Sequence, residues 1–205
     1  GGTMEITETL FENNICKIDL KGDAFGGGLR TGNGVSKIQK CAFINNTAYK
    51  QGGGLWVGEN EKEGHSNLIE NCSFIENTAQ EENTPNTGLG GAVMVGRGTS
   101  LFKNNTLVRN TAGQGGGIFG GANYTIQNTI IYDNTTTNPW NQNHQIYIDV
   151  TFNDTGGNIQ YLSPSIEVSS SNNSRLPNAL DEDPLFEENL NRTDGFTPVL
   201  KLTAS

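Results

Sequence analysis

"GGGLW", from Gly52 to Trp56, is the stretch that decides the fold, because close variants of it return along the chain. The variants are "GGGLR" at Gly26 to Arg30, "LGGAVM" at Leu89 to Met94 and "GGGIF" at Gly115 to Phe119. The glycine pairs in these stretches, counted from Gly1-Gly2, recur about every 26 residues with one longer interval. Such a period indicates a protein built from repeated structural units.

A second recurring motif lies between the glycine-rich stretches, which are here called glycine marks. It reads "FENN" from Phe11, "FINNTA" from Phe43, "FIENTA" from Phe74, "LVRNTA" from Leu107 and "IYDNTT" from Ile131. A further apolar column precedes it at Ile6, Ile38, Ile69, Phe102 and Ile126. Polar residues alternate with these positions, as they do in strands with one buried face.

Short strands separated by Gly and Asn turns, in a period of about 26 residues, predict an all-β fold: a right-handed parallel β-helix. In this single-stranded solenoid, equivalent residues of successive coils stack about 4.8 Å apart. We expect the glycine pairs to turn the chain with positive φ. We expect an asparagine ladder, with left-handed backbone, at one corner. Its members are Asn14, Asn46, Asn77, Asn110 and Asn134.

One domain is predicted, with the coils in residues 1–137. Residues 138–205 are predicted to form a degenerate last coil or coils and a C-terminal covering segment, which docks on the end of the solenoid or along its side. Polar insertions at 59–66 and 80–89 leave two different corners, and the segment from Ile15 to Phe25 leaves the same corner as the second. Loops on one flank of a solenoid commonly carry its function.

The composition limits the partners. The chain has 205 residues, a net charge of −9 and 33% hydrophobic residues. An acidic chain of this kind is a poor match for the phosphate backbone of nucleic acids or for an anionic membrane surface. It has no apolar run of about 18 residues, so we expect no membrane insertion in this segment. Because the repeat is already under way at the first residues, we expect a longer parent chain.

These marks resemble families of bacterial surface proteins. The pairing of a GG-aliphatic mark with an F-x-x-N mark is similar to the polymorphic outer membrane protein repeats, over residues 1–134. The tail "DEDPLF" and "DGFTPVLKL" resembles the end of the choice-of-anchor Q family of secreted β-helix proteins. The resemblance implies an extracellular or cell-surface location in bacteria, often with adhesion or polysaccharide contact, and it implies no catalytic residues.

One outward column is a candidate carbohydrate-binding ridge. It comprises the residues that follow the aliphatic position of each glycine mark, namely Arg30, Trp56, Met94 and Phe119. Aromatic rings beside an arginine can contact sugar rings. In the alternative interpretation, the C-terminal segment or an insertion packs over this ridge and buries it.

A second candidate site would belong to an enzyme. Glu76, Arg109 and Asp133 share one column, so they stand on consecutive coils, where a base and a cation could act on a uronate. This is the constellation that a polysaccharide lyase or epimerase of the pectate-lyase-like β-helix type would need. The same pattern also describes a solvated corner whose charges compensate one another.

No metal site and no cofactor are predicted. Calcium is conceivable at Asp19 with Asp23, or at the acidic cluster of residues 181–183, but neither has EF-hand spacing. His65 is predicted to be a surface residue, and it lies too far from His144 in the repeat to form a pair. Cys41 and Cys72 fall in one inward column of adjacent coils, within disulfide reach. With Cys16 they make an odd number, which gives no disulfide framework.

The residues favour a non-catalytic surface β-helix module for adhesion, carbohydrate contact or self-assembly, with the lyase or epimerase as the alternative. Its expected partner is a polysaccharide or another cell-surface molecule. End-to-end or lateral self-association is also expected, because an open β-helix end is an unpaired sheet edge. Binding to ice would need a regular threonine array, and the outward columns look too mixed for one.

Overall fold

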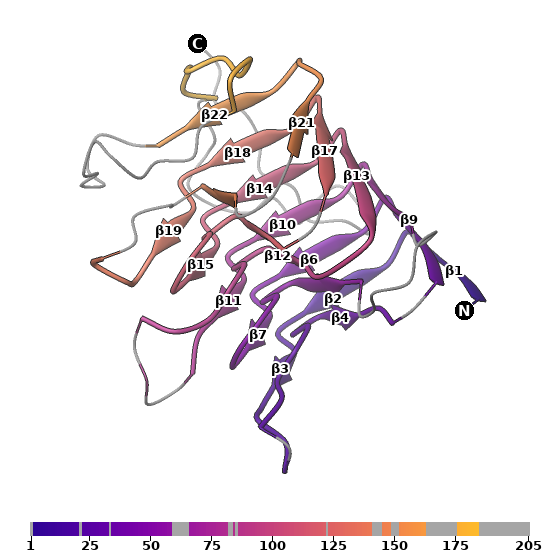
Figure 1. Cartoon of the computed structure of the whole chain (residues 1–205), viewed down its shortest axis with the longest axis vertical. Coiled ribbons are helices and arrows are strands. Elements are labelled where there is room, and N and C mark those ends of the chain that lie inside the picture. Colours follow the sequence, from indigo (N-terminus) through magenta and orange to yellow (C-terminus); the bar gives the residue numbers. More distant parts are fainter. Residues whose placement is uncertain are drawn as a thin grey trace.

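The computed structural model is a stack of coils made of short parallel strands (Figure 1). It describes residues 2–20, 22–32, 34–58, 66–81, 84, 86–121, 123–140, 145–148, 152–162 and 176–184. Within these ranges the regular elements are strands without exception. Each coil contributes one strand in turn to each of four parallel sheets, here called sheets I to IV. The prediction of a right-handed parallel β-helix is confirmed.

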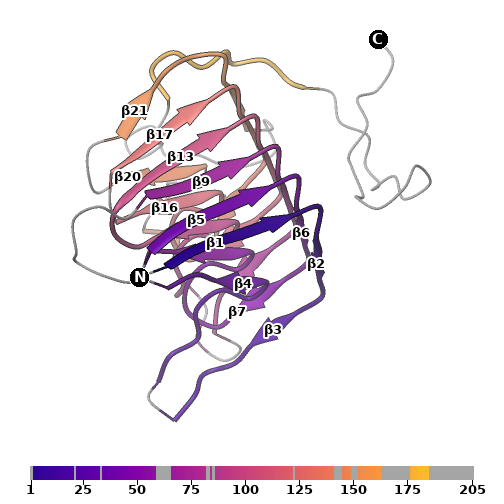
Figure 2. The same ribbon diagram turned by 90° about the vertical axis from the view of Figure 1, so that its right-hand side faces the viewer.

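Sheets I and II carry the longer strand columns. Sheet I contains β1 (Gly2–Thr7), β5 (Gly34–Gln39), β9 (Ser66–Glu70), β13 (Thr99–Lys103), β17 (Tyr124–Gln127) and β21 (Phe152–Asp154). Sheet II contains β2 (Leu10–Glu12), β6 (Ala42–Ile44), β10 (Ser73–Ile75), β14 (Thr106–Val108), β18 (Ile130–Tyr132) and β22 (Ile159–Tyr161). Figure 2 faces sheet I and shows its strands stacked from β1 to β21.

Sheets III and IV complete each coil. Sheet III contains β3 (Ile15–Cys16), β7 (Thr47–Ala48), β11 (Thr78–Ala79), β15 (Thr111–Ala112) and β19 (Thr135–Thr136). Sheet IV contains β4 (Leu29–Arg30), β8 (Leu55–Val57), β12 (Val93–Val95), β16 (Ile118–Gly120) and β20 (Ile146–Ile148). Strands β20 to β22 extend the ladders of sheets I, II and IV beyond residue 137.

The core is the inside of the stack, where like residues lie on like. The predicted column of Ile38, Ile69, Phe102 and Ile126 is fully buried in register. In the next sheet the Phe43 ring stacks on Phe11 and on Phe74, with ring centroids 4.7 Å apart in both pairs. A narrow interior one side chain deep on each wall explains how a chain with few apolar residues still forms a core.

The asparagine ladder lies at the corner between sheets II and III. Each side-chain Nδ2 donates to the Oδ1 of the next asparagine at 2.8 to 2.9 Å, from Asn14 through Asn134. The backbone prediction was off by one residue, because the residue before each ladder asparagine has the positive φ. These residues are Asn13 (57°), Asn45 (51°), Glu76 (56°), Arg109 (54°) and Asp133 (49°).

The glycine marks combine two separate requirements. The positive φ falls on the first glycine of each mark, with 66° at Gly52, and not on the pair that follows. At Gly53 and Gly54 a Cβ atom would instead press against backbone of the next coil. The pair is therefore needed for close approach between coils. The register aligns Gly54 with Ala92. The alignment of the glycine pair in "LGGAVM" with Gly53-Gly54 was therefore wrong by one residue.

Coil length varies because loops are inserted. Successive ladder asparagines are 32, 31, 33 and 24 residues apart, so the period of about 26 describes coils with little inserted chain. The pair Gly1-Gly2 does not belong to the glycine series, because Gly2 pairs with Gly34 in sheet I. The insertion at 59–65 lies outside the described residues, as do His65 and His144.

The two ends of the stack differ. At the first coil the inward residues Ile6, Phe11 and Leu29 are only partly buried, because no described coil lies below them. At the other end residues 176–184 cross the last coil, where Leu180 bridges Ile159 and Leu176 is buried in the core. Among the described residues, β1 to β4 each pair with a strand on one side, that of the second coil.

Candidate functional site

The ridge predicted on sheet IV exists as an in-register column. Arg30, Trp56, Met94 and Phe119 follow one another on adjacent strands, and Tyr147 of β20 continues the column. The exposed fractions of Trp56, Met94 and Phe119 are 6%, 8% and 9%, so these side chains are buried, whereas Arg30 is exposed. The ridge is thus a packed row with an exposed cation at its first-coil end.

A second column packs against the ridge across the glycine turn. Phe25, Gln51, Leu89 and Gln114 are linked by successive bridges. Phe25 stacks on Trp56 with centroids 5.5 Å apart, and Trp56 Nε1 donates to Gln51 Oε1 at 3.0 Å. The ridge is therefore buried in part by chain that belongs to insertions, since Phe25 and Leu89 lie at the ends of the long loops that follow β3 and β11.

The ridge rings present their edges to the outside. Phe119 and Tyr147 stack with centroids 4.5 Å apart and planes 5° from parallel, so ring faces meet along the solenoid axis. The Arg30 guanidinium carbon lies 5.1 Å from the Phe25 ring centroid and 5.2 Å from that of Trp56. These contacts place the exposed guanidinium over the Phe25 and Trp56 rings, an arrangement in which a guanidinium both stacks on aromatic faces and donates hydrogen bonds.

The charged column lies at the corner between sheets II and III. Glu76, Arg109 and Asp133 directly follow the paired strand ends Ile75, Val108 and Tyr132, so the structure does bring them onto consecutive coils. Arg109 Nη1 lies 3.9 Å from Glu76 Oε1. All three take the positive φ of the corner. They share a column because they occupy the bend, which is a structural reason for their alignment.

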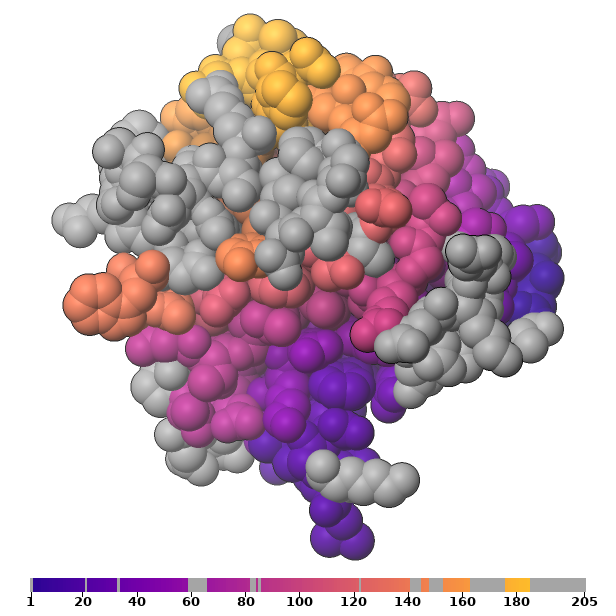
Figure 3. Space-filling model, in the orientation of Figure 1, coloured from indigo at the N-terminus to yellow at the C-terminus, as the bar shows by residue number. Residues whose placement is uncertain are grey.

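The corner between sheets III and IV is here called the loop flank. Sequence reasoning missed the exposed apolar residues in its loops. Long loops leave this corner after β3, β11 and β19, and short connections leave it after β7 and β15 (Figure 1). Trp140, in the loop after β19, is 89% exposed, and Ile18 and Leu20 are exposed in the loop after β3. Figure 3 shows the segment after β19 projecting from the left edge of the molecule. Apolar residues within polar insertions were the available signal.

A threonine column also escaped the sequence analysis. Thr47, Thr78, Thr111 and Thr135 begin four adjacent strands of sheet III, and the hydroxyls of Thr111 and Thr135 lie 3.1 Å apart. The sequence analysis had judged the outward columns too mixed for a regular threonine array, whereas sheet III carries one in-register threonine column. The next outward position holds Tyr49 and unlike residues beside it, so the regular threonine surface is one column wide.

The cysteines are free thiols. Cys41 and Cys72 are buried, and the Sγ of Cys72 lies 3.5 Å from the Ile38 carbonyl oxygen. A hydrogen bond between the two thiols lowers the pKa of Cys41 to about 7 and, with burial, raises that of Cys72. Both side chains face the core, so neither is placed to act on a ligand at the surface.

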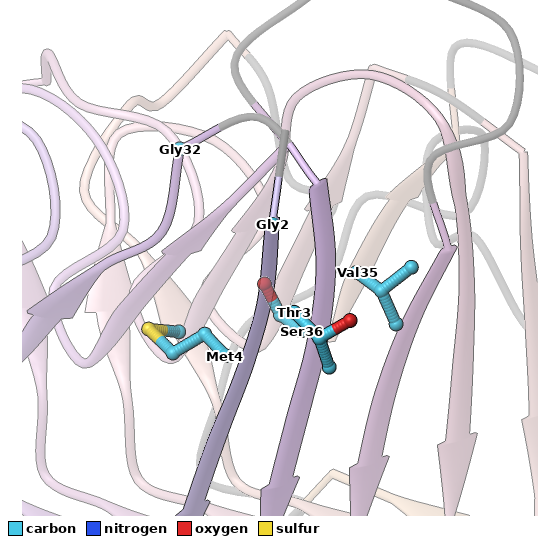
Figure 4. Close-up of a pocket in the computed structure, with 6 residues that line it drawn as sticks. All are labelled: Gly2, Thr3, Met4, Gly32, Val35 and Ser36. Atoms are coloured by element: carbon cyan, nitrogen blue, oxygen red, sulfur yellow. The ribbon is translucent and has the colours of Figure 1, made fainter.

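The described residues offer no grouping of three or more His, Cys, Asp or Glu side chains suited to a metal. At one proposed calcium position, Asp19 Oδ1 instead accepts a hydrogen bond from the Asp23 amide at 2.9 Å. A hollow beside β1 is lined by Gly2, Thr3, Met4, Gly32, Val35 and Ser36 (Figure 4). Its lining is uncharged, so it lacks an acid or a base.

The stacked coils, the amide ladder and the outward aromatic row define the class: a repeat-built parallel β-helix whose outer columns form its surfaces. Residues 40–58, from the corner before β6 to the end of β8, match the model of the Chlamydia polymorphic membrane protein repeat. This match points to a surface-exposed bacterial outer membrane protein. No curated protein and no solved structure matches the chain.

The described residues contain no helix with the length and apolar character that a membrane crossing requires. Beyond residue 184, the tail on which the choice-of-anchor Q resemblance rests lies outside the described residues.

Proposed function

We propose that the chain is a non-catalytic module of a bacterial surface protein that contacts carbohydrate or another cell-surface partner. The binding face joins the sheet IV ridge to the neighbouring loop flank. Trp140 carries the proposal, because its ring is 89% exposed on the loop that leads into β20, the strand that holds Tyr147 of the ridge. An exposed indole is suited to stacking on a sugar ring.

The ridge contributes in a different way from Trp140. Its rings are held edge-out, so they supply a fixed apolar border, and Arg30 supplies hydrogen-bond donors at the first-coil end of the row. Such a face favours a long ligand lying along the axis, because the contacts repeat at every coil. Affinity would then come from several weak contacts in a row.

A polysaccharide lyase or epimerase is the second candidate, and the proximity of Arg109 to Glu76 favours it. The guanidinium would neutralise a uronate while a carboxylate removes a proton. This site lies at another corner of the coil from the loop flank, so the two functions can be tested separately.

The experiment measures binding and turnover together on a panel of acidic and neutral polysaccharides, with absorbance reporting unsaturated uronate products. We expect binding without product, weakened in Trp140→Ala and in Arg30→Ala but unchanged in Glu76→Gln. Thr125→Ala, on the outward face of sheet I, is the matched control. Product formation that disappears in Arg109→Ala and Glu76→Gln would replace this proposal with the lyase.

A further inference from the structure

A second column of side chains ties the coils together at the corner between sheets I and II. Each member directly precedes a paired residue of sheet II, and the members are Thr9, Cys41, Cys72, Asn105, Thr129 and Asn158. Asn105 Oδ1 accepts a hydrogen bond from the Cys72 amide at 2.9 Å, and Asn158 Oδ1 accepts one from the Thr129 amide at 2.8 Å. In these coils a side-chain oxygen therefore joins each coil to the one before it.

Two sulfur atoms occupy this column in the second and third coils. The Cys72 thiol donates to the Ile38 carbonyl oxygen at 3.5 Å, as Asn105 Nδ2 donates to the Ile69 carbonyl oxygen at 2.9 Å. A thiol is a weak donor and a weak acceptor, so its hydrogen bonds hold adjacent coils less firmly than those of an amide. The column is therefore weakest between Cys41 and Cys72.

The register of the strands places the two thiols side by side. Ala42 and Ser73, the residues that follow the cysteines, pair in sheet II, and the Ser73 amide donates to the Cys41 carbonyl oxygen at 2.9 Å. The two Cα atoms are thus one strand spacing apart, about 4.8 Å, within the range of about 4.4–6.8 Å that disulfides span. Both side chains belong to the core cluster, and the thiols hydrogen-bond to each other.

We propose that Cys41 and Cys72 form a disulfide bond when the chain folds in an oxidising environment, so that the second and third coils become covalently linked. Both thiol protons and two electrons pass to an oxidant of the disulfide class, which is reduced to two thiols. One thiolate attacks the oxidant, and the other then displaces the mixed disulfide. This exchange precedes the closure of the third coil on the second, because both sulfur atoms are buried in the completed stack.

The surface location indicated by the repeat match supports the proposal, because proteins exported to bacterial surfaces meet oxidising conditions. The bond would be specific to this pair. Cys16, the remaining cysteine, lies opposite Ala48 in sheet III, so the second coil offers it no thiol in register. The inference does not depend on ligand binding.

Thiol counting on the full-length chain tests the disulfide. The chain is reduced and unfolded, refolded with reduced and oxidised glutathione, and then unfolded with a maleimide that labels free thiols. We expect one labelled thiol per chain, at Cys16, and proteolytic fragments joined through Cys41 and Cys72. Cys16→Ser, the matched control, should carry no label and keep the joined fragments.

The melting temperature provides a second measurement. The cysteines are 31 positions apart in the sequence, so the bond restricts the unfolded chain and should raise the melting temperature by at least about 5 °C over that of the reduced protein. Cys16→Ser should show the same rise. Cys41→Ser and Cys72→Ser should lose both the rise and the joined fragments.

Three results would overturn the proposal. The oxidatively refolded chain could carry three labelled thiols, or its fragments could be joined through Cys16. The oxidised chain could also melt at or below the temperature of the reduced chain, which would mean that the bond does not fit the native stack. The count on the unaltered chain decides the question even if a serine variant fails to fold.

Discussion

Asn77 and Asn110, one coil apart, share a hydrogen bond of 2.9 Å from Nδ2 of the first to Oδ1 of the second. The same Asn77 Nδ2 also donates to the Phe43 carbonyl oxygen at 2.8 Å, one coil in the other direction. Asn77 Oδ1 accepts from the amide and the side chain of Asn46. One buried side chain therefore connects three coils, with its polar atoms satisfied.

Replacing Asn77 by alanine should cost about 3 kcal/mol or more of unfolding free energy. The change leaves the Asn46 amide and the Phe43 carbonyl without these partners in a water-free corner, and each buried unpaired group costs about 1–3 kcal/mol. Equilibrium denaturation measures the loss. Asn123→Ala, at an exposed residue, should change stability by less than about 0.5 kcal/mol. Equal effects of the two changes would contradict the role given to the ladder.

The sequence predicted the ladder because its physical cause is local and repeated. The ladder asparagine stands three residues after the first residue of each F-x-x-N mark, so the spacing alone places it next to its counterpart in the following coil. The positive φ was assigned to the wrong residue because both Asn13 and Asn14 are asparagines, and composition cannot tell which of them turns. At later coils Glu76, Arg109 and Asp133 occupy that bend, which residue preference would not have indicated.

Gly53→Ala should destabilise the fold by at least about 2 kcal/mol, because a Cβ atom there would lie 2.5 Å from the Thr78 carbonyl carbon. The φ of Gly53 is not positive, so the effect is one of space between coils. Gly2→Ala is the matched control, since no atom lies within 4 Å of the added Cβ. Thermal unfolding of both variants measures the difference, and a neutral Gly53→Ala would mean that the coils can separate without penalty.

The buried Tyr124 should make stability depend on alkaline pH. Burial raises the pKa of Tyr124 above its ordinary value of 10.0, so the folded chain keeps the phenol protonated where the unfolded chain ionises it. This contribution to stability is present below pH 10 and is lost as the pH rises above it, at about 1.4 kcal/mol per unit. Tyr124→Phe removes the ionisation, so its unfolding free energy should fall less steeply above pH 10. Parallel pH profiles for the two proteins would show that Tyr124 is not kept neutral.

The candidate surfaces were less predictable than the fold, for a physical reason. Register fixes which residues share a column, so Arg30, Trp56 and Phe119 were aligned correctly from the sequence. The exposure of these side chains depends on the residues that pack on them from outside. Phe25 and Leu89 pack on the ridge from inserted loops, which do not follow the repeat pattern. Trp140 lies in such a loop as well, which is why periodicity could not single it out.

Replacement by alanine should lower the stability of the fold at Trp56 and the affinity for the ligand at Trp140. Trp56 is buried among Phe25, Met94 and Phe119, so Trp56→Ala should cost about 3 kcal/mol of unfolding free energy. Trp140 is 89% exposed, so Trp140→Ala should change stability by less than about 0.5 kcal/mol while weakening ligand binding. Denaturation and polysaccharide binding, measured on the same two variants, separate these roles. If Trp56→Ala abolished binding and left stability unchanged, the ridge would be an open ligand platform and its packing would have to be reinterpreted.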